Sequence, residues 1–196
     1  MGLTIYYKGN FRPEGSLPEM IDEVRDIAEI YKWKYNIFER EFPKGSLGKK
    51  TYDTNLYGIL LHPHKKCETV SLCFLSNGML CCPSSIIHLQ SKDEKNKKIL
   101  SGHFTKTQYA GPEIHKAIID FFRYLSKKYF KKFLMIDEGK YWETNDEKIL
   151  RETFKEWNAM MDGFAGALKT IKPKKSESLE SVIKRAAGKV HMKRRK

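Results

Sequence analysis

The densest group of carboxylates in the chain lies in the segment DEGKYWETNDE, residues 137–147. Carboxylates close to an imidazole can take up and release protons, which is the chemistry of general acid–base catalysis. The segment GHFTKTQYAGPEIH, residues 102–115, supplies a histidine and other polar groups ahead of a predicted helix, whose first amides can bind an anion. A pocket between the two segments would have three catalytic candidates, His103, Glu138 and Glu143, and four further pocket residues, Gln108, Asp137, Tyr141 and Trp142.

A structural role also explains much of both segments. Thr144 and Glu147 have the spacing of a capping box, in which two side chains satisfy free amides at the start of a helix. Asp146 would oppose the helix macrodipole at the same place. Residues 102–110 would then be a connection whose polar groups cap the next helix. In this alternative, four residues have no required role: Glu138, Tyr141, Trp142 and Glu143.

The segment HPHKKC, residues 62–67, is a candidate metal site. His62 and His64 are two residues apart, so on a strand both imidazoles would point to one face, and Cys67 would be a third ligand. Pro63 interrupts such a strand, and a fourth ligand would have to come from elsewhere, for example from His88 or His103. The alternative is a solvated turn between two strands.

The four cysteines, Cys67, Cys73, Cys81 and Cys82, do not have the paired C-x-x-C spacing of zinc sites. They lie among apolar residues, which favours buried reduced thiols over a reactive thiolate. The chain contains no glycine-rich phosphate-binding loop and no nucleophile-elbow or zinc-protease motif, and the sequence predicts no cofactor.

Positive charge is concentrated at the end of the chain. The net charge is +13, of which residues 172–196 carry +8. Binding to phosphates through such a segment would depend on salt and have little sequence preference, and removal of residues 172–196 would abolish it. The segment has no aromatic side chain for stacking on bases, and a solvated end is the alternative. Five residues are the binding candidates: Lys189, Lys193, Arg194, Arg195 and Lys196.

Hydrophobic periodicity predicts the elements that must position these residues. Strands are predicted at residues 3–9, 34–42, 56–62, 69–75, 79–83, 86–90 and 131–137, and residues 91–98 form a charged loop or helix end. Helices are predicted over residues 16–33, 111–130 and 145–168. This order is typical of an α+β fold with about three main helices packed on a mostly antiparallel sheet.

Two local features refine the prediction. Ser16 and Glu19 match a capping box at the start of the first helix. Asn77 and Gly78 favour a two-residue hairpin turn, because both accept the positive φ that this turn requires. With that turn, residue 73 would face residue 82 and residue 74 would face residue 81.

Composition and length define the expected class of protein. Apolar residues make up 40% of the chain, enough for a core, and no apolar stretch approaches the ~20 residues that cross a bilayer. The sequence has no pattern of a secretory signal, so we expect a cytoplasmic α+β domain over residues 1–170 and a basic linker and tail over residues 171–196, with a short helix near 178–187.

The leading functional hypothesis is a non-catalytic binding or interaction protein whose tail contacts nucleic acid or an acidic protein, without membrane association. The alternatives are a small enzyme with a pocket built from residues 102–109 and 137–143, and a metal-binding module at residues 62–67.

Overall fold

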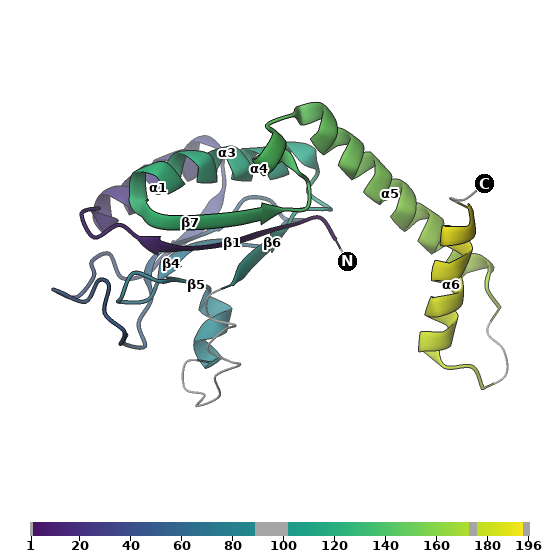
Figure 1. Ribbon diagram of the computed structural model, residues 1–196, viewed down its shortest axis with the longest axis horizontal. Helices are drawn as coiled ribbons and strands as arrows, with labels where there is room; N and C mark the ends of the chain where they lie inside the picture. The colour runs from purple at the N-terminus through teal and green to yellow at the C-terminus, as the bar shows by residue number, and fades with distance from the viewer. Residues whose placement is uncertain (1, 89–101, 173–175, 194–196) are drawn as a thin grey trace. The chain divides into compact units, whose positions relative to one another are not determined.

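The computed structural model describes residues 2–88, 102–172 and 176–193, and only the backbone of residues 87–88 and 189–193 (Figure 1). The protein is α+β with antiparallel strands, as predicted, and the strands form two sheets where one was expected. The chain forms two compact units, Met1–Leu150 and Arg151–Lys196. The first unit contains both sheets, and the boundary at residue 170 remains a prediction.

The first sheet has three strands in the order β6-β1-β7, with β1 antiparallel to both neighbours. The strands are β1 (Thr4–Phe11), β6 (His103–Lys106) and β7 (Phe130–Asp137). The predicted strands 3–9 and 131–137 correspond to β1 and β7. Strand β6 was expected to be a connection, because four residues are too few to show a clear two-residue period.

The second sheet has four strands in sequence order, β2-β3-β4-β5. They are β2 (Lys34–Ile37), β3 (Tyr57–His62), β4 (Val70–Phe74) and β5 (Leu80–Cys81). Strands β3 and β4 are almost entirely buried, which their apolar sequences predict. Strand β2 ends five residues earlier than expected.

The hairpin between β4 and β5 has a different register from the predicted one. Cys73 pairs with Cys81, not with Cys82, and Phe74 pairs with Leu80. The reason is a three-residue loop over residues 76–78, closed by a 2.9 Å hydrogen bond from the Leu75 amide to the Met79 carbonyl. Gly78 has a φ of 84°, as the last residue of such a loop requires.

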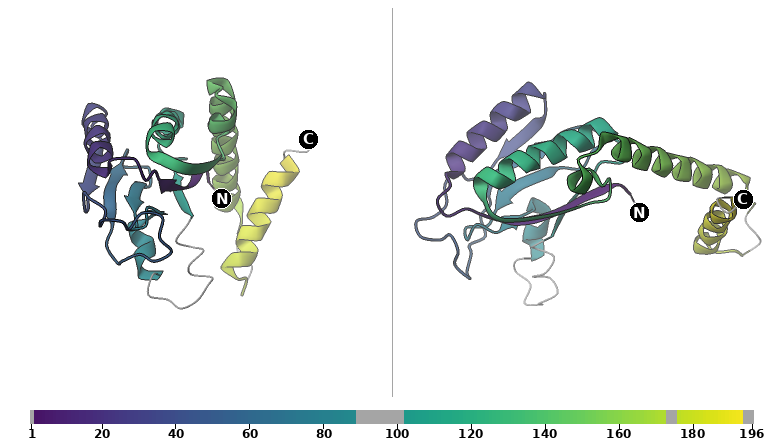
Figure 2. Two further views of the ribbon diagram at one scale, coloured as in Figure 1. Left: turned by 60° about the vertical axis from the view of Figure 1, so that its left-hand side comes forward. Right: turned by 45° about the horizontal axis from the view of Figure 1, so that its top comes forward.

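The two helices α1 (Leu17–Ile30) and α3 (Pro112–Tyr129) lie on the same side of the strands (Figures 1 and 2). Helix α1 is capped by Ser16, whose side chain accepts a hydrogen bond from the Glu19 amide, as predicted. Such a cap stabilises a helix by about 1 kcal/mol. Both helices turn an apolar stripe toward the interior.

Three shorter or later elements complete the described chain: α4 (Tyr141–Thr144), α5 (Glu147–Thr170) and α6 (Leu179–Lys193). The helix count is therefore higher than the predicted three. Asp146, not Thr144, caps α5, because its carboxylate accepts the amides of Lys148 and Ile149.

Residues 83–88 form the 3₁₀ helix η1, where a strand over residues 86–90 was predicted. The last two residues of that predicted strand and the segment 91–98 lie outside the described residues.

Aromatic packing defines an inner and an outer face of the first sheet. Tyr7 of β1 packs on Phe122 of α3 with ring centroids 4.6 Å apart, and Phe133 of β7 stacks on the same ring at 5.4 Å. Because side chains alternate along a strand, the neighbours of Tyr7 and Phe133 point to the outer face.

Among the described residues, none of the helices combines the length and the apolar character needed to cross a membrane.

Candidate functional site

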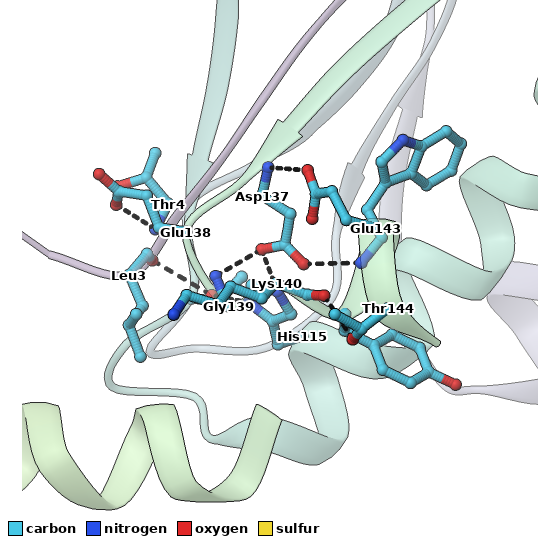
Figure 3. Close-up of polar contacts among 12 residues, drawn as sticks. Leu3, Thr4, His115, Asp137, Glu138, Gly139, Lys140, Glu143 and Thr144 are labelled. Carbon is cyan, nitrogen blue, oxygen red and sulfur yellow. Dashed lines mark hydrogen bonds and ion pairs between the residues drawn. The ribbon is translucent and has the colours of Figure 1, made fainter. Parts of the chain in front are cut away.

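A row of three polar side chains connects the residue after β6 with α3 and β7 on the inner face of the first sheet. Figure 3 shows two of them, His115 and Asp137. The Nδ1 atom of His115 lies 2.6 Å from the Thr107 hydroxyl, and its Nε2 atom lies 2.8 Å from Asp137 Oδ1. We call Thr107, His115 and Asp137 the polar row. Its order of hydroxyl, imidazole and carboxylate is the order used in nucleophilic catalysis.

The strand register brings the three residues together. Ile5, in the central strand β1, pairs with Thr105 on one side and with Asp137 on the other. Thr107 follows two residues after Thr105 and therefore has the same orientation. His115 lies on the buried stripe of α3, one turn after the helix begins, and extends between the two strand ends.

Asp137 is also the acceptor for the turn that follows β7. Its Oδ1 atom accepts the Gly139 amide at 2.7 Å, and its Oδ2 atom accepts the Trp142 amide at 3.0 Å. Glycine is required at position 139 because a Cβ atom there would lie 2.7 Å from His115 Nε2. The Asp137 amide donates in turn to the Glu143 carboxylate at 3.3 Å (Figure 3).

Burial opposes ionisation of Asp137, but the hydrogen bond and charge of His115 and the two donated amides outweigh it. The pKa of Asp137 is therefore below its ordinary value. The polar row is closed to solvent, since Thr107 and His115 are 0% exposed and Asp137 is 5% exposed. A substrate cannot reach the hydroxyl in this conformation, so the polar row joins three elements of the fold.

The predicted catalytic residues do not converge in the structure. His103 is buried on the inner face, where its Nε2 atom lies 2.9 Å from the Leu80 carbonyl, and burial lowers its pKa. Glu138 accepts the Thr4 amide at 2.9 Å. Glu143 binds the Asp137 amide, so the structure brings Glu143 to Asp137 and not to His103. Each of the three candidates forms a hydrogen bond with a different backbone group.

The other predicted pocket residues are divided between two places. Tyr141 and Trp142 lie beside the Arg123 guanidinium, whose carbon is 4.7 Å and 5.8 Å from the two ring centroids. Gln108 lies against Gly2, two residues before β1 begins. Of the predicted pocket, the structure therefore assembles only the part built by residues 137–143.

The predicted metal ligands His62, His64 and Cys67 line one groove but do not form a metal-binding group. His62 is exposed at the end of β3, and His64 Nδ1 accepts the Lys66 amide at 3.1 Å. Burial raises the pKa of Cys67 to about 12, which keeps it a thiol at neutral pH. Among the side chains that the structure describes, which do not include that of His88, no three form a group that could hold a metal ion.

The remaining cysteine and tail predictions have different outcomes. Cys73 and Cys81 are buried thiols, as expected, whereas Cys67 and Cys82 are partly exposed. Burial raises the pKa of Cys81 to about 12. The side chains of Lys189 and Lys193 lie outside the described residues, as do Arg194, Arg195 and Lys196 entirely. Binding by the basic tail therefore remains a prediction.

The outer face of the first sheet carries large apolar side chains that are open to solvent. Tyr6 is 42% exposed and Phe104 is 53% exposed, with ring centroids 6.3 Å apart on paired residues of β1 and β6. Leu134 and Ile136 of β7 are 62% and 67% exposed. Exposed apolar groups that adjoin one another commonly mark a binding surface.

Lysines complete this outer face. Lys8, Asn10, Lys106 and Lys132 are its other exposed positions, and Thr4 is a buried one. Lys106 Nζ lies 5.8 Å from the centroid of the Phe104 ring. The outer face is defined here by seven residues: Tyr6, Lys8, Phe104, Lys106, Lys132, Leu134 and Ile136.

Sequence reasoning missed both the polar row and the outer face. His115 recurs with Ile118 and Phe122 at helical spacing, so a histidine on an apolar stripe was the available signal for the polar row. For the outer face, the available signal was the adjacent pair Tyr6 and Tyr7, because neighbouring residues of a strand point to opposite faces and both rings cannot be buried on one face. The partner ring of Phe104 could not be found, because β6 itself was not predicted.

Comparison with known proteins returned no relatives: no protein-family model matches the chain, and no curated protein or solved structure matches it.

Proposed function

We propose that this protein binds single-stranded nucleic acid on the outer face of the first sheet and acts as a binding protein, not as a catalyst. The observation that carries this proposal is the exposed pair Tyr6 and Phe104 on adjacent strands, surrounded by lysines. The proposal keeps the functional class predicted from the sequence, a non-catalytic binding protein, and assigns the principal contact to the first sheet in place of the basic tail.

The two rings offer what the basic tail does not have, which is a surface for base stacking. Every base has an apolar π-face, and stacking on an aromatic side chain contributes about 1–3 kcal/mol per base without sequence preference. Tyr6 and Phe104 are neighbours across two paired strands, so they can take two bases of one strand. Leu134 and Ile136 extend the apolar contact onto β7.

The charges of the outer face complement a phosphate backbone. Lys8, Lys106 and Lys132 are exposed. None of the outward positions of β1, β6 and β7 in the described chain is acidic. Lysine contacts to phosphates release counterions and make the affinity depend on salt.

The geometry favours single strands over duplexes. In a duplex the base faces stack on one another, and only base edges and the backbone are available to a protein. A face that depends on ring stacking therefore needs splayed bases. The cationic tail residues, such as Lys193 and Arg194, would add attraction without sequence preference.

The test measures the affinity of the full-length protein for labelled oligouridylate, oligothymidylate and a matched duplex across a salt series. We expect tighter binding to the single strands. Tyr6→Ala and Phe104→Ala should each weaken that binding by about 5- to 150-fold, the equivalent of one lost stack. Tyr109→Ala, which removes an exposed tyrosine outside the outer face, should leave the affinity unchanged.

A second set of variants separates the tail from the sheet. Replacing Lys193, Arg194, Arg195 and Lys196 by alanine should lower the salt dependence and retain the loss caused by Tyr6→Ala. Two outcomes would overturn the proposal: no binding to any single strand at low salt, or equal affinities of the Tyr6→Ala, Phe104→Ala and Tyr109→Ala variants. Equal affinities would assign any observed binding to the tail charges alone.

A further inference from the structure

A second basic surface lies at the edge of the other sheet. A groove with a cavity volume of about 900 Å³ lies where β2 begins and β3 ends. None of the described residues that line it is acidic. Its principal polar side chains are Lys32, Lys34, Tyr35, His62, His64 and Lys65, and we call it the basic groove.

One wall of the basic groove is fixed by the end of α1. Lys32 has a φ of 56°, and its amide donates to the Glu29 carbonyl at 3.1 Å, which ends the helix. The next residue, Trp33, is buried and packs edge-on against Phe121 with centroids 5.8 Å apart. The lysines on either side of this anchor, Lys32 and Lys34, are therefore held at fixed positions.

The other wall is the loop after β3, which begins opposite Lys34 because Lys34 pairs with His62. His64 closes this loop by accepting the Lys66 amide at its Nδ1 atom and the Cys67 amide at its carbonyl. Since Nδ1 is an acceptor, the neutral ring carries its proton on Nε2. His64 can therefore donate a hydrogen bond to a phosphate oxygen.

The same loop is bound along the edge of the first sheet. The Glu68 amide donates to the Lys106 carbonyl at 3.1 Å, and the Lys106 amide donates to the Glu68 carboxylate at 2.9 Å. The Thr105 hydroxyl donates to the Thr69 carbonyl at 2.8 Å. Lys65 precedes Glu68 by three residues, so it lies within roughly 10 Å of chain from the edge of the outer face.

Nearby carboxylates are already engaged. Glu68 holds the Lys106 amide, and Glu29 accepts a hydrogen bond from the Tyr35 hydroxyl at 3.1 Å. These groups lie outside the lining of the basic groove. The groove therefore presents lysine and histidine donors to an incoming anion.

We propose that the basic groove binds the sugar–phosphate backbone of the same single strand whose bases stack on the outer face, so that the two surfaces form one continuous site. This inference rests on the proposed function. It assigns different contacts to the two parts, which are base stacking at Tyr6 and Phe104 and phosphate binding at Lys34 and Lys65. A longer strand then binds more tightly than one that only covers the outer face.

The experiment uses full-length protein with labelled oligouridylates of about five and about fifteen nucleotides, within the usual range of site sizes. The groove variant is Lys34→Ala with Lys65→Ala. The control is Lys127→Ala with Lys148→Ala, which makes the same change of net charge at exposed helical positions outside the basic groove. Thermal unfolding of both variants verifies that they are folded.

We expect the groove variant to bind the long strand about tenfold more weakly than the wild type. The slope of log affinity against log salt concentration should fall by up to about 1.4, because two phosphate contacts are lost. The short strand and the control should keep wild-type affinity. At 0.15 M salt, charges act over only about 8 Å, so a long-range effect of net charge is excluded.

The other outcomes separate this inference from the proposed function. If the short strand binds and the groove variant leaves the long-strand affinity and slope unchanged, the continuous site is wrong and the outer face alone is sufficient. An equal loss for both strands would also overturn the two-part site. If the wild type binds neither strand, the proposed function fails and the inference fails with it.

Discussion

The two faces of the β6-β1-β7 sheet differ in access although the same three strands build them. The inner face carries the groups best suited to catalysis, in the polar row, and packing closes them to solvent. The outer face carries apolar rings and aliphatic side chains that composition alone would assign to a core, and they are exposed. The comparison teaches that access, not residue type, separates a structural network from a binding surface.

The largest expected effect distinguishes the buried Asp137 from the partly exposed Asp120. Asp137→Ala should lower the free energy of unfolding by about 3–5 kcal/mol, because it removes the acceptor of three groups, His115 Nε2 and the amides of Gly139 and Trp142, at roughly 1–3 kcal/mol each. Asp120→Ala on α3 breaks the partly exposed pairs with Lys116 and Arg123 and should cost about 1 kcal/mol. Urea unfolding followed by circular dichroism measures both. Equal losses for the two variants would contradict the structural role of the polar row.

A smaller effect compares two adjacent tyrosines on opposite faces. The Tyr7 hydroxyl accepts the buried Ser71 amide at 2.9 Å. Tyr7→Phe leaves that amide without an acceptor and should cost about 1–3 kcal/mol in unfolding free energy. Tyr6→Phe changes an exposed position and should change stability by less than about 0.5 kcal/mol while retaining nucleic-acid binding. A stability loss at Tyr6 as large as at Tyr7 would show that the outer face is covered.

The smallest effect is the dependence of stability on pH. The pKa of Asp137 is lower in the folded protein than in the unfolded chain, so below about pH 4 the unfolded chain binds more protons. The stabilisation by Asp137 is therefore complete above the ordinary pKa of about 3.9 and is lost as pH falls toward the folded value. For one group the slope cannot exceed about 1.4 kcal/mol per pH unit.

Unfolding measured between pH 3 and pH 6 for the wild type and Asp137→Asn isolates this contribution. Glu23 also has a lowered pKa, since its bonds to Tyr124, Tyr129 and Lys128 outweigh the cost of its burial. The effect of Glu23 is the same in the wild type and in Asp137→Asn, so it cancels in the difference between their free energies of unfolding. A difference that stays constant over this range would show that Asp137 does not change its protonation on unfolding.

Local patterns in the sequence were sufficient for much of the fold. The helical periodicity and the cap at Ser16 located α1, and the apolar stripe through Ile118 located α3. These elements depend on neighbours three or four residues away, which a sequence displays directly. The predicted hairpin register was wrong by one residue because the loop has three residues, 76–78, in place of the predicted two. Ser76 of this loop also contacts Ser46 and Asp53.

The candidate sites depended on contacts that the sequence does not display. Asp137 was recognised as polar and placed at the end of a strand, but its partner His115 was taken as part of an ordinary helix. Phe104 became the neighbour of Tyr6 only through the pairing of β6 with β1, between residues almost one hundred positions apart. Pairing over such a distance follows from the packing of the whole sheet, not from local preference.

The sequence by itself determined the α+β class, the principal helices, the strands β1 and β7, and the excess of positive charge, because composition and short-range periodicity carry this information. Only the tertiary structure decided which face of the first sheet is closed by α3 and which remains open. A strand's two-residue period separates its side chains into two sets but does not say which set is buried. The packing of Phe122 on Tyr7 makes that choice, closes the polar row and leaves Tyr6 and Phe104 exposed.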